Sequence, residues 1–289
     1  MMNSILITGG AGSFGRAFAR ALLDHGVERV CIFSRGEHRQ AEMRAEFNDD
    51  PRLRWLIGDV RDKGRLVTAM EGCDVVVHAA ALKRIEVCAY CPIEVVRTNI
   101  MGSVNVIEAA HEAGVGNVVA LSTDKAWQPI SAYGQSKALM ESLFLAANHS
   151  YGDHGPRYCV TRYGNVWWST GSVGPTWQDM VDRGDQWVPC TDPDCTRFFM
   201  TMDEAVDLVM DTVAGMERGG PEANGDLIIP MSLPAYRLGD LAEAFGVATN
   251  VTGLPAHEKK HEGLMDGLTS DKARRMTVQE LREAIASVG

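Results

Sequence analysis

Near its N-terminus the chain reads Thr8-Gly9-Gly10-Ala11-Gly12-Ser13-Phe14-Gly15. An apolar run at 4–7 precedes these glycines and predicts a buried strand, and apolar residues at helical spacing follow and predict a helix. Glycines 10, 12 and 15 form Gly-x-Gly-x-x-Gly, which is typical of a dinucleotide site in this position. They allow a tight turn and the close approach of a pyrophosphate, while the helix N-terminus supplies unpaired N–H donors. The alternative is a glycine-rich turn without a ligand.

Strands and helices alternate beyond this loop. Apolar runs predict buried strands at 29–33, 53–57, 75–79, 118–121 and 158–163, and helical periodicity predicts helices that include 92–113 and 131–147. Alternating strands and helices indicate an α/β fold with a doubly wound parallel sheet.

The alternation ends in a stretch rich in Gly, Pro, Asp and Trp between 164 and 196. Beyond it, patterns predict helices at 203–216 and 278–287 and a strand at 226–229. We therefore expect a dinucleotide-binding domain at 1–165 and a smaller substrate lobe at 166–289, interleaved with the first.

Composition excludes several classes of partner. The 289 residues contain 28 Lys+Arg and 38 Asp+Glu, a net charge of −10, which argues against nucleic acid or an anionic membrane. No apolar run approaches the roughly 20 residues of a membrane-spanning helix, so we expect a cytoplasmic protein with no membrane partner. The seven cysteines are odd in number and scattered, which indicates free thiols. A zinc site of Cys88, Cys91, Cys190 and Cys195 is disfavoured by its loose spacing, and we expect no metal.

The end of the second strand distinguishes between cofactors. NAD sites usually place Asp or Glu there, whereas this chain reads Phe33-Ser34-Arg35, with Arg39 one turn later. A guanidinium suits a 2′-phosphate better than a 2′-hydroxyl, so the sequence favours NADP over NAD. The alternative is that both arginines are merely solvated.

Candidate reactive residues follow the fifth strand. Tyr133 and Lys137 are spaced i, i+4, which places a phenol and an ammonium on one helix face. A nearby cation lowers the pKa of a phenol, so Tyr133 could take a proton from a substrate hydroxyl that Thr123 holds. A solvated helix face is the alternative for an isolated pair.

These motifs together resemble the extended short-chain dehydrogenase/reductases through the glycine loop, Gly58-Asp59-Val60, His78-Ala79-Ala80-Ala81, Asn99, Thr123 and Tyr133/Lys137. Within that family the chain resembles the bacterial inverting UDP-N-acetylglucosamine 4,6-dehydratases in Ala80-Ala81-Leu82-Lys83, Leu121-Ser122-Thr123-Asp124-Lys125-Ala126, Arg162-Tyr163-Gly164-Asn165-Val166, Thr196-Arg197-Phe198, and Glu258-Lys259 with His261-Glu262. The resemblance implies a Rossmann sheet and cofactor contacts from Gly9, Gly12, Ser13, Phe14, Gly15, Ser34, Arg35, Arg39, Asp59, Val60, Ala79, Ala80, Ala81, Asn99, Tyr133 and Lys137.

The resemblance also implies a reaction. Tyr133, with Thr123 and Lys137, would help oxidise carbon 4 of the sugar, Lys125 would remove the carbon 5 proton, and Asp124 would protonate the departing 6-hydroxyl. Reprotonation from the opposite face would invert carbon 5. A lysine base must be partly neutral, so we expect burial or cations such as Lys83 to lower the pKa of Lys125.

A UDP-sugar is the implied partner, and the family suggests a homo-oligomer. The residues implied for substrate binding are Lys83, Asn165, Ser172, Val173, Arg197 for the diphosphate, and Glu258 for the ribose or the order of its loop. Trp167 and Trp168 replace small family residues, and their indoles could shrink the hexose pocket or stack on the uracil. We expect one of the two to lie in the core instead. His78 is expected to be a hydrogen-bonded core histidine. The alternatives are a UDP-sugar 5,6-dehydratase, a 4-epimerase, and a non-catalytic dinucleotide-binding regulator.

Overall fold

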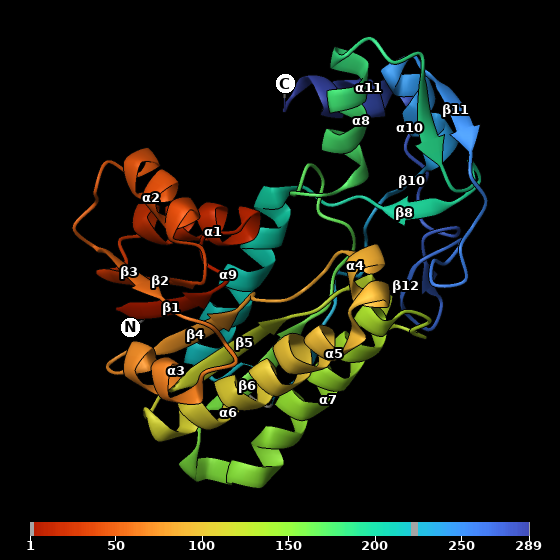
Figure 1. The fold of residues 1–289 in the computed structure, drawn as a ribbon. Helices are drawn as coiled ribbons and strands as arrows, with labels where there is room; N and C mark the ends of the chain where they lie inside the picture. Colours follow the sequence, from red (N-terminus) through yellow and green to blue (C-terminus); the bar gives the residue numbers. More distant parts are fainter. Residues whose placement is uncertain (1–2, 221–224, 289) are drawn as a thin grey trace.

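A seven-stranded parallel sheet organises the chain, in the order β3-β2-β1-β4-β5-β6-β9 (Figure 1). The structure is a computed structural model that describes residues 3–220 and 225–288. The strands are β1 Ser4–Thr8, β2 Arg29–Ser34, β3 Leu53–Ile57, β4 Val75–His78, β5 Asn117–Leu121, β6 Arg157–Thr161 and β9 Leu227–Ile228. The strand order reverses beside β1, as in the Rossmann fold. The predicted fold class is confirmed.

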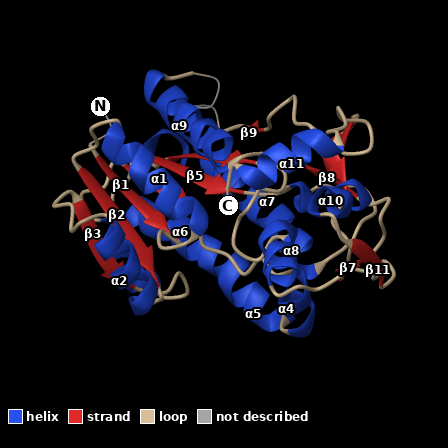
Figure 2. Cartoon of the chain, turned by 90° about the horizontal axis from the view of Figure 1, so that it is seen from above, coloured by secondary structure: helices blue, strands red, loops and turns tan. Residues whose placement is uncertain are grey.

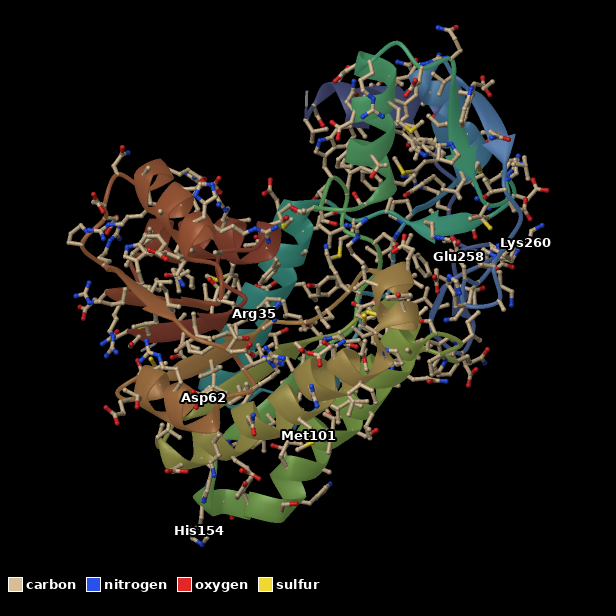
Figure 3. The ribbon with its side chains drawn as sticks, viewed as in Figure 1. Arg35, Asp62, Met101, His154, Glu258 and Lys260 are labelled. Carbon is tan, nitrogen blue, oxygen red and sulfur yellow. The ribbon has the colours of Figure 1, made fainter. Side chains whose placement is uncertain are left out.

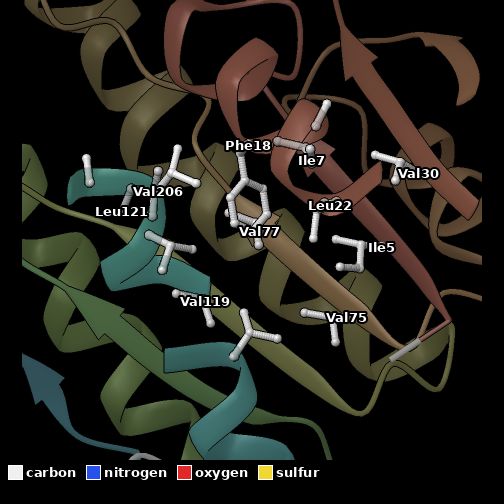
Figure 4. Packing of buried hydrophobic residues seen from close by; sticks show 14 of the residues in the cluster. Ile5, Ile7, Phe18, Leu22, Val30, Val75, Val77, Val119, Leu121 and Val206 are labelled. Carbon is white, nitrogen blue, oxygen red and sulfur yellow. The ribbon is translucent and has the colours of Figure 1, made fainter. Parts of the chain in front are cut away.

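Helices cover both faces of the sheet. They are α1 Ser13–Asp24, α2 Glu37–Glu46 and α9 Met202–Arg218 on one face, and α3 Lys63–Met70, α6 Gly102–Glu112 and α7 Ala132–Tyr151 on the other. Successive residues of β1 point to opposite sides, so that Ile5 and Ile7 join the first core and Leu6 the second. Figure 4 shows Phe18 and Leu22 of α1 over the β1 side chains. Burial on both faces explains the continuous apolar runs of these strands.

The helix predicted at 92–113 is interrupted. It consists of α5 Pro92–Val95, a π-helical turn η1 Val96–Met101, and α6, and a short helix α4 Ile85–Tyr90 precedes it. The π-helical turn contains Asn99, whose side chain is buried and turned toward the segment after β4. Gly102 follows the turn, where an added Cβ would lie 2.8 Å from Val60 Cγ2. Such turns often mark functional sites, and the sequence periodicity did not reveal this one.

The second lobe has a separate core. Its helices are α8 Val173–Asp182, α10 Leu238–Phe245 and α11 Val278–Ala286. Its strands are β7 Trp187–Cys190, β8 Thr196–Phe198, β10 Ala235–Arg237, β11 Ala248–Val251, β12 Gly263–Met265 and β13 Leu268–Thr269. These strands pair as β10-β8, β11-β7 and β12-β13. The first part of the chain also contains two 3-10 turns, η2 Asp124–Ala126 and η3 Gly152–His154. Figure 2 shows α8, α10 and α11 grouped beside the main sheet. Because α9 packs on the main sheet and β9 joins its edge, the chain returns to the first part after residue 165.

Two expectations about buried side chains are confirmed. Trp167 is 7% exposed, and its Nε1 donates to the Ala284 carbonyl at 3.2 Å. His78 lies in the core, with Nδ1 2.8 Å from Thr8 Oγ1 and Nε2 3.3 Å from Ser103 Oγ. Burial lowers the pKa of His78 to about 3, so its ring is neutral.

Within residues 3–220 and 225–288, no helix is both long enough and apolar enough to cross a membrane.

Candidate active site

The phosphate loop fits the pyrophosphate of a dinucleotide. Gly9 has φ +68°, and an added Cβ would lie 2.9 Å from Ala80 N. A Cβ on Gly15 would lie 2.3 Å from the Gly10 carbonyl oxygen, so the turn has no room for larger residues. The N-cap of α1 is Gly12, which supplies no side chain to the first N–H groups. Those donors are therefore free to bind an anion.

A cavity of about 340 Å³ adjoins this loop. Its lining residues are Ala11, Gly12, Ser13, Arg16, Arg39, Glu42 and Thr170. Thr170 comes from the second lobe, and its Oγ1 lies 2.6 Å from Ser13 Oγ. No sequence motif predicts this contact, which joins residues 157 positions apart. It brings the second lobe directly onto the phosphate loop.

The end of β2 carries the residues expected to select the cofactor. Arg35 is exposed, with Nη1 3.9 Å from Asp59 Oδ2, and it projects from the sheet in Figure 3. Arg39 lines the cavity beside the loop. Ser34 Oγ accepts a hydrogen bond from Gln40 Nε2 at 3.0 Å. The structure thus brings Ser34, Arg35, Arg39 and Asp59 to one edge of the sheet.

Asn99 fixes Leu82, the residue directly after Ala79-Ala80-Ala81. Its Oδ1 accepts from Leu82 N at 2.8 Å, and its Nδ2 donates to Leu82 O at 2.9 Å and to Ser136 Oγ at 3.0 Å. These bonds hold the chain just beyond Ala80, whose N would lie 2.9 Å from a Cβ added at Gly9 of the phosphate loop. Val60, another predicted cofactor contact, is buried.

A compact group of polar residues follows β5. Thr123 Oγ1 donates to Asp124 Oδ1 at 2.9 Å, and Lys125 Nζ lies 3.1 Å from the same oxygen. Lys125 Nζ also donates to Asn165 Oδ1 at 3.0 Å and lies 3.4 Å from Glu262 Oε1. Together Thr123, Asp124, Lys125, Asn165 and Glu262 form what we call the acid/base centre. The first four were proposed from the sequence, and Glu262 was not.

Asp124 is suited to hold a proton. Its side chain is fully buried, and Oδ2 has no hydrogen-bond partner. Burial raises the pKa of Asp124, the Lys125 charge opposes the rise, and the Glu262 charge adds to it, with a net increase. Asp124 therefore holds a proton more readily than an exposed aspartate does.

The expectation that the pKa of Lys125 is lowered is wrong for this structure. Burial lowers this pKa, but the charges of Asp124 and Glu262 outweigh burial, and the net pKa is raised. Arg197 is the neighbouring cation that opposes the rise. Lys83 is affected in the other direction, since burial and then the Lys125 charge lower the pKa of Lys83. Lys125 is consequently an ammonium here.

The expected effect of Lys137 on Tyr133 is also wrong for this structure. Burial raises the pKa of Tyr133 to about 12, and the cation that opposes this rise is Lys125. Lys137 Nζ donates to the Leu121 carbonyl, and burial lowers the pKa of Lys137 to about 8. Tyr133 and Lys137 still lie on the buried face of α7, next to Thr123.

The residues proposed for the diphosphate and ribose lie in the second lobe. Arg197 is 5% exposed and pairs with Glu258 through Nη2, while Nη1 donates to Thr196 O at 2.8 Å. Figure 3 shows Glu258 across from the sheet edge that carries Arg35. Ser172 is the N-cap of α8, Val173 begins that helix, and Ser172 Oγ is buried without a partner. Free donors at this helix start suit an anionic group.

The cysteines considered for a zinc site lie in different parts of the structure. No group of three or more His, Cys, Asp or Glu residues arranged for a metal occurs in the part of the chain that the structure describes. Cys88 is buried in α4, with Sγ donating to Leu82 O at 3.6 Å. Cys190 and Cys195 belong to the core of the second lobe.

Comparison with known proteins identifies relatives over most of the chain. Residues 5–283 match the family described as polysaccharide biosynthesis protein. A UDP-N-acetylglucosamine 4,6-dehydratase (inverting) from Campylobacter jejuni is 42% identical over 262 residues, which is 90% of this chain and 76% of the relative. A UDP-glucose 4-epimerase from Rickettsia akari is 39% identical over 280 residues, 93% of this chain and 80% of the relative.

Solved structures agree with the fold. Pen from Bacillus thuringiensis superposes with a TM-score of 0.89 at 32% identity, covering 99% of this chain and 98% of that one. A dTDP-glucose 4,6-dehydratase from Streptomyces venezuelae, solved with NAD bound, superposes with a TM-score of 0.81 at 23% identity. The match covers 98% of this chain and 96% of that one. At that identity the second likeness shows the fold alone.

Proposed function

The chain belongs to the polysaccharide biosynthesis family of extended short-chain dehydrogenase/reductases, and on that premise we propose that it is a dinucleotide-dependent UDP-hexosamine 4,6-dehydratase. UDP-N-acetylglucosamine is the proposed substrate, and a 4-keto-6-deoxy sugar with inverted carbon 5 is the proposed product. The carrying observation is the Asp124–Lys125 pair, with 3.1 Å between Oδ1 and Nζ, next to Thr123. Dehydration needs an acid and a base beyond the tyrosine that suffices for oxidation at carbon 4.

The first step is oxidation of carbon 4. Tyr133 takes the proton of the 4-hydroxyl, and Thr123 holds that hydroxyl in place. A bound oxidised nicotinamide dinucleotide would accept hydride from carbon 4, favour the Tyr133 phenolate by its positive charge, and return hydride to carbon 6 after dehydration. The ketone at carbon 4 then makes the carbon 5 proton acidic.

Elimination of water uses the acid/base centre. Lys125 removes the carbon 5 proton, the 5,6 double bond forms, and the 6-hydroxyl leaves as water with a proton from Asp124. Once a bound dinucleotide had returned hydride to carbon 6, a proton from solvent would enter carbon 5 on the opposite face. Lys137 supports the step by joining α7 to the end of β5, because its Nζ donates to the Leu121 carbonyl.

The remaining site residues bind the two ligands. We assign the cofactor to the phosphate loop, the end of β2 and the segment that Asn99 orders. We assign the substrate diphosphate to Arg197 and the start of α8, its ribose to Glu258, and its hexose to the side of the centre near Lys83 and Asn165. The proposed division is a cofactor part at 1–165 and a substrate lobe at 166–289. Burial of Arg197 strengthens its attraction for an anion once Glu258 is displaced.

NADP is the proposed cofactor, and it gives a direct prediction. Replacing Arg35 and Arg39 together by Ala removes two guanidinium groups from the edge of β2, so affinity for NADP should fall about tenfold or more. Affinity for NAD should stay nearly unchanged. Calorimetric titration of both dinucleotides measures the difference, and Arg44→Ala on the same helix is the control. An equal loss of affinity for NAD and for NADP would argue against contact between these arginines and a 2′-phosphate.

We also propose that the chain forms a homo-oligomer through the outer face of α4, α5, η1 and α7. Its exposed apolar side chains are Tyr90, Ile93, Val96, Met101 and Leu139. Figure 1 shows α4, α5 and α7 side by side, and Met101 of η1 is labelled in Figure 3. A second copy could cover this face by two-fold symmetry.

Ile93→Glu tests that surface. Ile93 is 63% exposed, and a charge there should lower the mass measured by light scattering toward that of one chain. Met231→Glu places the same charge on another exposed apolar residue and should leave the mass unchanged. A wild-type mass equal to one chain would refute the proposal.

The epimerase relatives supply the second candidate function. A 4-epimerase keeps the 6-hydroxyl and leaves the mass of the sugar unchanged, whereas the dehydratase releases one water and a 5,6-dehydratase stops at the alkene. Mass spectra of UDP-N-acetylglucosamine incubated with the protein and NADP distinguish these outcomes. A regulator without catalysis would bind NADP and return unchanged substrate.

A further inference from the structure

Glu262 is a buried carboxylate that the steps above do not use. It is 2% exposed, and its Oε1 lies 3.4 Å from Lys125 Nζ. Its Oε2 lies 3.3 Å from Lys259 Nζ. Ser270 fixes the backbone of Glu262, because Glu262 N donates to Ser270 Oγ at 2.9 Å and Ser270 N donates to Glu262 O at 2.8 Å. Ser270 Oγ is in turn 2.6 Å from Thr196 Oγ1. The backbone of Glu262 is therefore anchored to β8, while its carboxylate lies between Lys125 and Lys259.

The surroundings of Lys125 bear on its role as a base. An ammonium has three N–H donors, and oxygens of Asp124, Asn165 and Glu262 lie around Nζ at 3.1, 3.0 and 3.4 Å. Because all the valences of an ammonium nitrogen are used, Nζ has no lone pair for a substrate proton. One proton must therefore leave Nζ before Lys125 can act on carbon 5.

We propose that Glu262 is a positioning residue that keeps one proton on the Asp124–Lys125 pair, so that a shift of this proton from lysine to aspartate prepares base and acid together. The inference rests on the proposed dehydratase function. In the shift, the N–H bond of Lys125 breaks and an O–H bond forms on Asp124, which gives an amine and a carboxylic acid. The amine then takes the carbon 5 proton, and the acid gives its proton to the leaving 6-hydroxyl. Both groups return to their starting forms, and elimination consumes no external proton.

The sign of the Glu262 effect follows from the charges around the pair. The Glu262 charge raises the pKa of both Asp124 and Lys125. The cations that face the centre are Arg197, Lys83 and Lys259, and the neighbouring phenols are Tyr133 and Tyr236. Glu258, which pairs with Arg197, is the nearby carboxylate that would remain. Without the negative charge of Glu262, the positive charges around the centre are less balanced, and they favour the deprotonated forms of Asp124 and Lys125. Both groups should then lose their protons at lower pH.

The pH–rate profile reports these changes. At low pH both groups are protonated and the base is blocked, and at high pH both are deprotonated and the acid is lost, so the profile should be bell-shaped. Removing one charge within about 4–6 Å should move both limbs of the profile by about one pH unit or more. A residue that only supports the fold would lower the rate without moving the limbs.

The test compares Glu262→Gln, Glu262→Asp and the wild-type protein, with dehydrated product measured by mass spectrometry across pH. Glu262→Gln should move both limbs to lower pH, whereas Glu262→Asp keeps the charge and should keep the limbs while lowering kcat. Lys259→Gln, which removes a cation beside the same carboxylate, should move the limbs to higher pH. This variant preserves the test if Glu262→Gln does not fold.

If Glu262→Gln and Lys259→Gln are active and both limbs of their pH–rate profiles match those of the wild-type protein, the role of Glu262 is overturned. The proposed function is then left intact. Absence of product from the wild-type protein with every UDP-hexosamine tried would refute the proposed function itself. The two failures are therefore distinguishable.

Discussion

Replacing Lys125 by Met should abolish dehydration, with turnover of UDP-N-acetylglucosamine lowered by about 10³-fold or more. Lys125 is the one group at the acid/base centre that the proposal assigns to the carbon 5 proton, and Met fills a similar volume without a basic nitrogen. The substitution leaves Asp124 and Glu262 buried without their shared cation. Asp124 can accept this change as a neutral acid, since its pKa is already raised.

This experiment separates two stages of the reaction. Oxidation of carbon 4 does not use Lys125, so reduced cofactor should accumulate in the variant while dehydrated product does not. Absorbance of the reduced nicotinamide measures the first stage, and mass spectrometry measures the second. Lys63→Met, on the exposed surface of α3, is a matched control that should turn over normally. Wild-type rates in the Lys125 variant would show that the base has been misassigned.

Replacing Tyr133 by Phe should block the reaction one stage earlier. The change removes one hydroxyl from the buried face of α7, and we expect a loss of about 10²- to 10⁴-fold in turnover. Neither reduced cofactor nor dehydrated product should appear, because the 4-hydroxyl has lost the group that takes its proton. Binding of NADP should persist, since the phosphate loop is untouched.

Tyr151→Phe provides the control for this variant. Tyr151 lies at the other end of the same helix, where its ring stacks on His111 with centroids 4.1 Å apart. It should keep wild-type turnover. Accumulation of reduced cofactor in the Tyr133 variant, at the level of Lys125→Met, would contradict the assigned order of proton transfers.

Much of the fold could be predicted from local patterns. Apolar runs identified the strands because the sheet is buried on both faces, and the glycines identified the turn into α1 because only glycine fits there. The π-helical turn at η1 could not be predicted, since its residues keep a nearly helical periodicity. Most short elements of the second lobe were missed, because a two- or three-residue strand carries too few residues for periodicity to show.

The site was predictable where motifs are local in sequence. Thr123, Asp124, Lys125 and Tyr133 lie within one strand-end segment and the helix that follows. Glu262 meets Lys125 only through the tertiary fold, and no spacing rule connects them. The errors about the pKa values of Lys125 and Tyr133 have the same origin, because the charges and burial that set them come from distant segments.

The central claim is most directly tested by incubating the purified protein with NADP and UDP-N-acetylglucosamine in deuterated water, followed by proton NMR and mass spectrometry of the sugar. The account predicts loss of one water, deuterium at carbon 5, and ring couplings that report its inversion. A product that keeps its 6-hydroxyl and its carbon 5 proton would contradict it.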